Sequence, residues 1–570
     1  MGSNNKKDYN VFFHTHTVSG IVISIGLFVI FFCGAIALFM ENIDHWETNE
    51  KSSDLFTKID YQQILDSVEA KGYDMHGRDF FINAFHGHVS VFAQPLRDST
   101  LQKSVLRLLS DSVANGPISL EFDAETYAQF TPEDETEEAY LGDFIYGLHY
   151  FRQLPVIGIY LSGIVSLFFL FAIITGLIVH WKKIIEFFFT FRLRSSIKNL
   201  WADAHTVLGV IGLPFQLMYA ITGAVFGLTI LVFLPMGAVH YDMNQEAMFK
   251  EVYPSPLTKV FETKGYAEKV YDVNQVISST IEDVPKENLK YLGVTVKTYK
   301  DENAHIGLNL RTNLKSGFFN SIDYIVRLAD NEVVFEKAAD EAPPYSVGVV
   351  EFVHKIHFAD YGNGLVKWLY FFTALLTCFM IIAGVVLWLR ARDNKIYADQ
   401  KKFNTNVAAI YMGVCLGLYP AIAFLFIMVK ALPSDFTVLS WIFLGFWVAF
   451  TIYAFVIKDL YKITKNAFYL AGFLGIVVPF FNGLQSGLWF WKSLKEGYTD
   501  SFLVDVSWLL FSVITLIVAF KTKNKKVKPI SRPQEKEIEK EKKSIPLPNR
   551  IKPQLRKEEP ILTLRPEQLN

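Results

Sequence analysis

The sequence predicts an α-helical polytopic membrane protein with about eight transmembrane helices, in which the first four spans form a duplicated four-helix bundle. The 570-residue chain is 51% hydrophobic, and its mean hydropathy is +0.24. Its apolar runs are about as long as the ~20 residues that a helix needs to cross a ~30 Å hydrocarbon core. These runs lie at residues 18–40, 157–181, 207–236, 366–389, 405–430, 438–457, 466–490 and 504–520.

Lysine and arginine gather in the loops on one side of the predicted membrane. They follow the second, fourth and sixth runs and fill the tail that begins at Lys521. Basic residues accumulate on the cytoplasmic side of short loops. Alternating spans with a cytoplasmic N-terminus place every one of these clusters inside. We therefore expect both termini in the cytoplasm and the two long polar loops outside.

Composition shifts divide the chain into seven segments. Each outer segment mixes amphipathic stretches with alternating ones, which predicts a small α+β module. The last segment is rich in proline, lysine and glutamate and cannot bury a core, so we expect it to be disordered. The segments are the N-terminus and first span (1–40), the first outer module (41–147), the second and third spans (148–236), the second outer module (237–352), the fourth span (353–395), a C-terminal four-helix membrane unit (396–520) and a basic cytoplasmic tail (521–570).

The first four spans are an internal repeat that preserves histidines. The first span opens with HTVSG from His16, and the third opens with HTVLG from His205. A glycine–alanine pair follows 18 residues after each of these histidines. His149 and His357 each precede a glycine of the following span by 27 residues. The repeated unit is thus a helix, an outer module and a second helix.

The repeat predicts two pairs of histidines near opposite membrane faces. His16 and His205 stand at the inner ends of their helices, whereas His149 and His357 precede their spans and so lie outside. A parallel repeat has a pseudo-twofold axis along the membrane normal, across which equivalent residues can face one another. His180 is an alternative inner candidate, although its counterpart in the second repeat is not a histidine.

Paired imidazoles in a four-helix bundle suit either bis-histidine haem or a transition-metal site. Haem needs an axial nitrogen on each side and apolar walls, whereas a transition-metal site usually recruits carboxylate or cysteine as well. Aspartate and glutamate are scarce in the first four spans, while phenylalanine, leucine and small residues are plentiful. The residue pattern favours haem. Two haems through a ~30 Å core would carry electrons across it.

These motifs resemble those of the PepSY-associated transmembrane family, which includes inner-membrane ferrisiderophore reductases. The two HTVxG starts are similar to the family's histidine-x-x-x-glycine helix starts. The segment VHKIHF, which ends at Phe358, resembles its leucine-histidine-phenylalanine-glycine motif, and the stretch from Gly384 to Arg390 resembles its terminal aromatic-basic cluster. The resemblance covers about residues 10–395. Ala359 stands where that motif usually has glycine.

The resemblance implies a membrane-bound oxidoreductase with two b-type haems and two PepSY-like periplasmic modules in the bacterial inner membrane. His16 and His205 would ligate the inner haem iron, and His149 and His357 the outer, with His180 as a possible replacement at the inner site. Electrons would reduce a periplasmic ferric siderophore or another iron chelate. Reduction would release the metal because Fe(II) is held more weakly by hard oxygen ligands.

No glycine-rich dinucleotide fingerprint follows a predicted strand, so we expect a separate electron donor, either quinol or a cytosolic flavoprotein. The expected partners therefore include membrane lipid but no nucleic acid. Two alternatives remain open. The first is a secondary transporter, because internal repeats and many spans are typical of carriers. The second is a non-catalytic sensor or peptidase regulator that acts through its outer modules.

Overall fold

The computed structural model describes residues 3–51, 58–85, 88–93, 116–124, 126–130, 140–189, 191–192, 197–252, 254, 257, 259–269, 271–284, 289–312, 318–319, 321–362, 364–392, 399–432 and 436–523. Apart from its first three residues, the tail predicted to be disordered (521–570) lies outside this range.

Eight helices in the described part of the chain are long and apolar enough to cross a membrane, which confirms the predicted number of spans. They are α1 (Ser3–Ala37), α7 (Ile157–His180), α10 (Leu213–His240), α14 (Gly364–Arg392), α15 (Lys401–Ala431), α16 (Phe436–Ile457), α17 (Leu460–Ser486) and α19 (Thr499–Lys521). The shorter helices are α2 (Met40–Thr48), α4 (Tyr61–Glu69), α6 (Leu141–His149), η2 (Trp181–Lys183), α8 (Ile184–Phe189), α9 (Ile197–Ile211), α11 (Gln245–Val252), α12 (Val273–Thr280), α13 (Tyr345–Phe358) and α18 (Phe490–Glu496).

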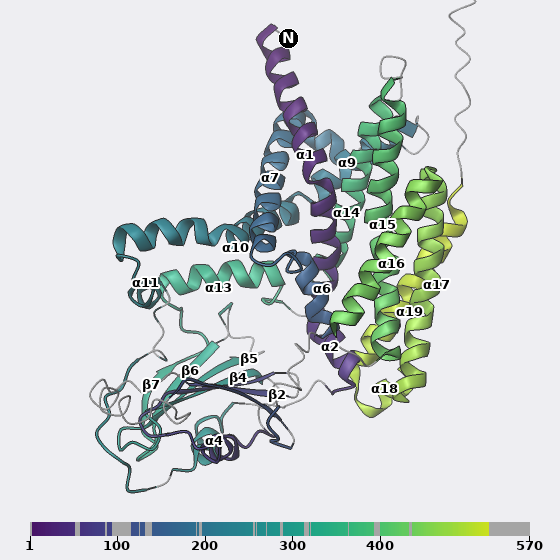
Figure 1. The fold of residues 1–570 in the computed structure, drawn as a ribbon. Helices are drawn as coiled ribbons and strands as arrows, with labels where there is room; N and C mark the ends of the chain where they lie inside the picture. The colour runs from purple at the N-terminus through teal and green to yellow at the C-terminus, as the bar shows by residue number, and fades with distance from the viewer. Residues whose placement is uncertain are drawn as a thin grey trace, which may run out of the picture. The chain divides into compact units, whose positions relative to one another are not determined.

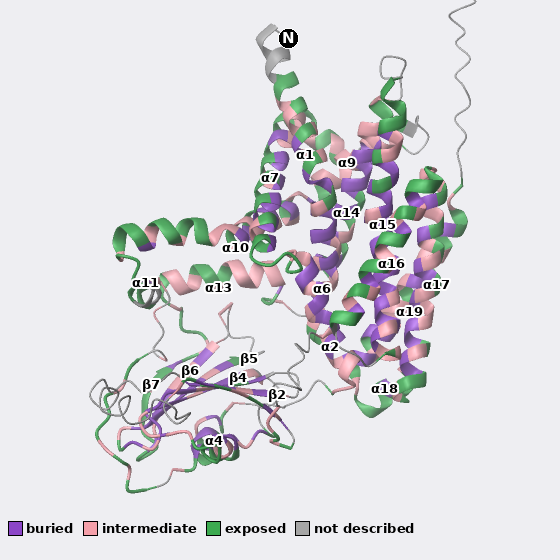
Figure 2. Ribbon diagram, in the orientation of Figure 1, coloured by how far each residue is buried: buried purple, intermediate pink, exposed green. Residues whose placement is uncertain are grey.

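The membrane helices form two groups that share one apolar core. In the duplicated part, α1 packs against α7 and α14, α9 packs against α14, and α10 packs against α7. In the C-terminal part, α15 packs against α16 and α17, and α17 packs against α19. Helix α15 also touches α1 and α14, so it joins the two groups (Figure 1). Figure 2 shows buried residues on the facing sides of these helices and exposed residues on their outer sides.

The third span is broken, whereas the sequence predicted one continuous helix over 207–236. Gly212 separates α9 from α10, which continues in another direction (Figure 1). Pro214 lies in the first turn of α10, where its missing N–H costs no helical hydrogen bond. The buried side chain of Gln216 donates to the carbonyl oxygen of Leu208 across the break, at 3.4 Å. The same carbonyl oxygen accepts from the backbone N–H of Gly212 at 2.9 Å, so this amide adds a second bond across the break.

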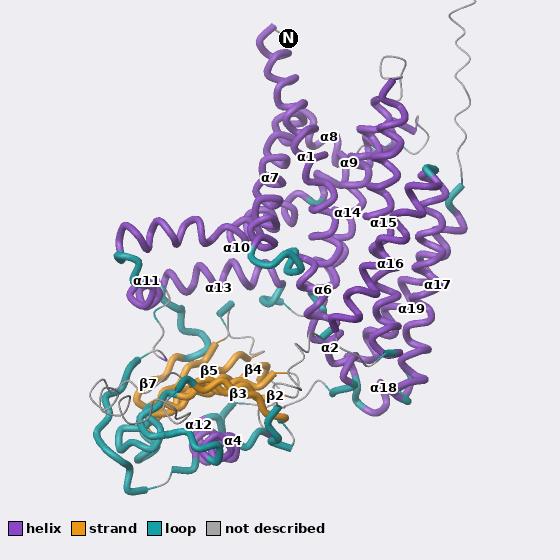
Figure 3. The backbone as a smooth tube through the Cα atoms, viewed as in Figure 1, coloured by secondary structure: helices purple, strands orange, loops and turns teal. Residues whose placement is uncertain are grey.

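The two outer segments, predicted as two separate modules, together form one seven-stranded antiparallel sheet with a shared core (Figure 3). Its order is β3-β2-β1-β4-β5-β6-β7, and β1 pairs with β4 across the junction of the two segments. Each half-sheet alone would leave an edge of unpaired backbone groups, which this pairing satisfies. The strands are β1 (Phe80–Phe85), β2 (His88–Ala93), β3 (Ile118–Asp123), β4 (Leu289–Lys297), β5 (His305–Thr312), β6 (Ser321–Arg327) and β7 (Val333–Lys337).

The helices that precede the two half-sheets also meet. Asp60 caps the N-terminus of α4, and Asp272 caps that of α12. The backbone N–H of Tyr61 donates to the side-chain oxygen of Asn274 at 2.9 Å, and the Asn274 amide donates to Asp60 at 2.5 Å. Each outer segment thus has an aspartate-capped helix before its strands, and the two helix starts bind one another.

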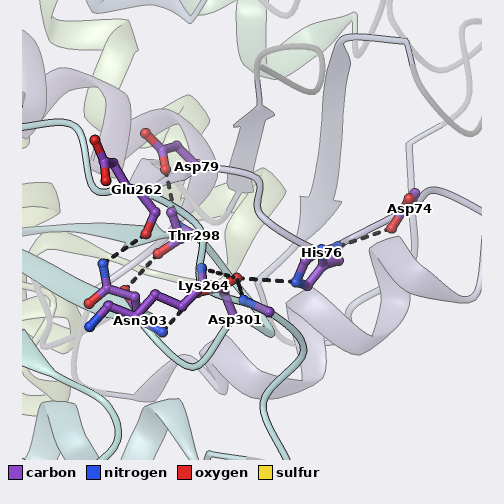
Figure 4. A network of polar contacts seen from close by, with 9 residues as sticks. Asp74, His76, Asp79, Glu262, Lys264, Thr298, Asp301 and Asn303 are labelled. Carbon is purple, nitrogen blue, oxygen red and sulfur yellow. Dashed lines mark hydrogen bonds and ion pairs between the residues drawn. The ribbon is translucent and has the colours of Figure 1, made fainter. Parts of the chain in front are cut away.

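A buried carboxylate joins loops from both outer segments (Figure 4). Asp301 is fully buried and accepts hydrogen bonds from the backbone N–H groups of Lys264, Gly265 and Asn303 at 2.8–3.1 Å. Its carboxylate also lies 3.3 Å from the Nε2 of His76, which belongs to the first segment. Burial alone would raise the pKa of Asp301, but the three backbone donors and the charge of His76 together hold it below the ordinary value.

Candidate cofactor site: two histidine pairs

The first histidine pair lies between the two repeats. His16 of α1 and His205 of α9 have ring centroids 6.1 Å apart and ring planes inclined at 60°. The Nδ1 of His16 lies 2.9 Å from the carbonyl oxygen of Ala172 in α7. The Nδ1 of His205 lies 3.0 Å from the carbonyl oxygen of Met380 in α14. Each histidine therefore bonds to the second span of its own repeat, as the duplication requires.

The second pair joins two short helices rather than two spans. His149 ends α6 and His357 lies near the end of α13, with ring centroids 6.0 Å apart and ring planes inclined at 55°. The Nδ1 of His149 lies 2.7 Å from the carbonyl oxygen of Ile30 in α1. The Nδ1 of His357 lies 2.7 Å from the hydroxyl of Thr222 in α10. Here each histidine bonds to the first span of its own repeat.

These hydrogen bonds set the tautomer of all four imidazoles. Three of the Nδ1 atoms face carbonyl oxygens, which only accept, so Nδ1 must carry the proton. The hydroxyl of Thr222 donates to the carbonyl oxygen of Met218 at 2.8 Å, so it accepts from His357. The four Nε2 atoms have no hydrogen-bond partner among the residues that the structure describes. An Nδ1–H bond of this kind orients an imidazole that ligates a metal through Nε2.

The separations within each pair fit two axial ligands on opposite sides of one metal ion. A metal–imidazole bond is about 2 Å, and the ring centre lies roughly 1.1 Å beyond the nitrogen, so two trans ligands have centroids about 6 Å apart. Both pairs have this separation. All four histidines are of intermediate burial. Two nitrogen donors per site suit a macrocycle that supplies the other four, as haem does.

The donor sets do not resemble an ordinary protein metal site. No group of three or more His, Cys, Asp or Glu side chains that could hold a metal ion occurs in the described ranges. The three cysteines, all buried, are free thiols: Cys33, Cys378 and Cys415.

Three glycines lie directly against the imidazoles. A larger residue at any of them would collide with a histidine ring, so these positions allow the helices to approach the rings closely. A Cβ would lie 3.1 Å from the His16 ring at Gly176, 2.9 Å from the His205 ring at Gly384, and 2.6 Å from the His149 ring at Gly34.

The fourth repeated glycine breaks this symmetry. A Cβ at Gly223 would meet the Ser166 hydroxyl at 2.7 Å instead of an imidazole. The adjacent Thr222 provides the contact with His357 in its place. The repeat counterpart of Thr222 is Cys33, so the sequence repeat offered no signal for this partner. The break between α9 and α10 lies between His205 and Gly223, whereas α1 is continuous from His16 to Gly34.

The two pairs are separated along the bundle. His16 and Ile30, which marks the position of the second pair, are 14 residues apart on α1, or about 21 Å of helix. The part of α1 between them carries the buried side chains of Ile23, Leu27 and Phe28. Aromatic rings gather at the second pair, where Phe31 contacts Tyr219 at a centroid distance of 5.7 Å and Tyr219 contacts the ring of His357 at 5.5 Å. The interval is apolar, as expected for a membrane interior.

His180 lies outside both pairs. It ends α7, one turn after Gly176, and its ring meets Phe187 edge-on at 5.1 Å. It is close enough to interact electrostatically with His16 and His205. His180 is therefore a neighbour of the first pair and not a member of it.

The family described as the PepSY-associated transmembrane region matches residues 13–391, about two thirds of the chain. The chain belongs to this family. All four paired histidines lie inside the family match, whereas α15–α19 lie outside it. A protein of Pseudomonas aeruginosa, named Uncharacterized protein PA4219, is 23% identical over 284 residues, which cover 47% of this chain and 68% of that protein.

Proposed function

We propose that this multi-pass membrane protein is a dihaem b-type reductase that passes electrons across the membrane to an extracytoplasmic ferric chelate. The observation that carries the proposal is the pair of matched histidine sites, each with ring centroids about 6 Å apart and with no Nε2 hydrogen bond to any residue that the structure describes. The proposal also follows from the resemblance to ferrisiderophore reductases of the same family.

The chain's own residues would hold and orient the two cofactors. His16 and His205 would bind one haem, and His149 and His357 the other, each through Nε2. The Nδ1–H bonds to neighbouring helices fix the four ring orientations. When bound, haem supplies one-electron transfer between its ferric and ferrous states. Apolar side chains between the sites keep water away from the path.

The direction of transfer rests on the topology predicted from the basic loops. With both termini in the cytoplasm, the first pair faces inward and the second faces the periplasm, beneath the loops that carry the sheet. A quinol or a cytosolic flavoprotein would supply electrons inside. A ferric siderophore or a similar iron chelate would accept them outside, and its iron would leave as Fe(II).

The test is single-turnover reduction by the full-length protein in detergent. Protein reduced with stoichiometric dithionite should show paired Soret and α-band shifts, and these bands should reoxidise when a ferric hydroxamate chelate is added with a ferrous trap. A colourless preparation would overturn the proposal. Haem bands that ferric chelates fail to reoxidise would overturn the assigned acceptor.

A further inference from the structure

The C-terminal four-helix unit binds the short helix α2, which follows α1, through several hydrogen bonds. This unit is formed by α15, α16, α17 and α19. The side chain of Trp46 is fully buried, and its indole N–H donates to Asp505 of α19 at 2.8 Å. The Lys430 ammonium of α15 donates to the carbonyl oxygens of Trp46 and Glu47, both at 2.8 Å. Asp505 and Lys430 of the C-terminal unit thus both bind residues near the C-terminal end of α2.

A second group of side-chain contacts holds the middle of the same helix. Asp500, at the start of α19, lies 2.6 Å from the Nδ1 of His45 and accepts from the Asn42 amide at 2.7 Å. Lys430 also donates to the side chain of Asn49, the left-handed residue that terminates α2. Cations that bind the last carbonyl groups of a helix stabilise its C-terminus. Helix α2 is consequently fixed along its whole length.

Helix α2 in turn holds the helix that ends in a proposed haem ligand. The first backbone N–H groups of α6 have no cap from Tyr140. Carboxyl oxygens from α2 take this role: Glu47 accepts from the N–H of Leu141 at 2.6 Å, and Asp44 accepts from that of Gly142 at 2.7 Å. A Cβ at Gly142 would lie 2.5 Å from Asp44, so the contact requires glycine.

A helix of nine residues moves as one body, so fixing its start also fixes its end. Helix α6 begins at Leu141 and ends at His149, about 13 Å away. In the second repeat, no side chain among the described residues provides such a cap. The equivalent helix α13 starts after Pro344 without a side-chain cap, and carries His357.

We propose that the C-terminal four-helix unit positions His149 through α2 and α6. Trp46 and Lys430 are the positioning residues, and they act on one of the two outer ligands only. The role as a ligand rests on the proposed function, but the mechanical linkage from α15 and α19 to α6 does not. This linkage gives the four spans outside the family match a function in the same protein.

The test is hydrogen–deuterium exchange of the full-length protein in detergent, comparing Trp46→Phe and Lys430→Met. Phenylalanine keeps an aromatic ring against Phe426 but removes the N–H donor together with part of the indole volume. The controls are Trp441→Phe on the exposed face of α16 and Lys402→Met at the other end of α15. We expect exchange in residues 141–149 to rise about tenfold in both test variants, while exchange in residues 345–358 stays at the wild-type rate.

Unchanged exchange in 141–149 in both test variants would overturn the proposal. An equal rise in 345–358 would also overturn it, because that result indicates general loosening. In haem-loaded protein the same variants should shift the midpoint potential of one haem and leave the other unchanged. Equal shifts of both haems, or none, would contradict the assignment to His149. If the protein holds no haem, the proposed function fails while the exchange result still decides the linkage.

Discussion

At the scale of single residues, the proposed sites depend on how closely two helices approach each imidazole. Gly34 is the tightest such position, because a Cβ there would lie 2.6 Å from the Nδ1 of His149. That nitrogen is already bound to the carbonyl oxygen of Ile30 at 2.7 Å, so the ring cannot retreat without losing its partner. A single methyl group therefore suffices to displace the ligand.

Gly34→Ala should lower the haem content from two to one per chain, since only the His149–His357 site is disturbed. The pyridine haemochrome assay of purified protein measures this content. Gly445→Ala in α16 is the control, because nothing lies within 4 Å of its added Cβ and it is remote from both histidine pairs in the sequence. Two haems with unchanged spectra in the Gly34 variant would contradict the assigned site.

Thr222→Val should weaken haem binding at the same site by about 10–100-fold, as the loss of partners that orient metal ligands does elsewhere. Valine keeps the shape of threonine but cannot accept from the Nδ1–H of His357. The rate of haem transfer to excess apomyoglobin provides the measurement. Thr222→Ser should restore slow transfer, and Thr229→Val on the exposed side of α10 should leave it slow. If valine and serine behave alike, the hydroxyl does not orient His357.

At the scale of elements, α2 connects the two groups of membrane helices through an ion pair that responds to pH. Burial opposes protonation of His45, but the hydrogen bond and charge of Asp500, together with the charges of Glu50 and Glu41, raise its pKa above the ordinary value. A histidine whose pKa is higher in the folded than in the unfolded state stabilises the fold. This stabilisation is fully present below about pH 6.5 and is lost as the pH rises through the folded-state pKa.

The difference in unfolding temperature between wild type and His45→Gln should therefore be larger at pH 6 than at pH 9, as measured by thermal unfolding in detergent. Asp44, whose pKa burial raises to about 8, also loses stability over part of this range. It does so in both proteins, and the charge of His45 has only a minor lowering effect on the pKa of Asp44, so the difference reports mainly on His45. His14→Gln, at an exposed position, is the control. A difference that is independent of pH would contradict the account of this pair.

Several elements could be predicted from sequence because they follow from local composition. Hydropathy alone located the eight spans, and the repeat singled out His16, His205, His149 and His357, which the structure brings together in two pairs. The break at Gly212 was not predicted, although Pro214 inside the apolar run is a residue type that breaks helices. The joined sheet was not predicted either, because the pairing of β1 with β4 is a contact between segments about 200 residues apart in the sequence.

At the scale of the whole molecule, the two repeats pair their histidines among the membrane helices and join their strands into one sheet in the outer segments. Equivalent helices hold equivalent histidines, and equivalent half-sheets share one core. The C-terminal unit breaks the symmetry, because it binds α2, whose carboxylates cap α6, and Phe443 of α16 also contacts Phe144 of α6. No hydrogen bond or ring contact joins this unit to α13 among the described residues. The two proposed haem sites therefore differ in how they are supported, although their ligands are related by the repeat.

The number of haems per chain, in wild type and in His205→Ala and His357→Ala, tests the central claim most directly. The account predicts two b-type haems in the wild-type protein. It also predicts one haem in each single variant, with different absorption maxima because each variant loses a different site. Retention of two haems in either variant, or a wild-type protein without haem, would contradict it.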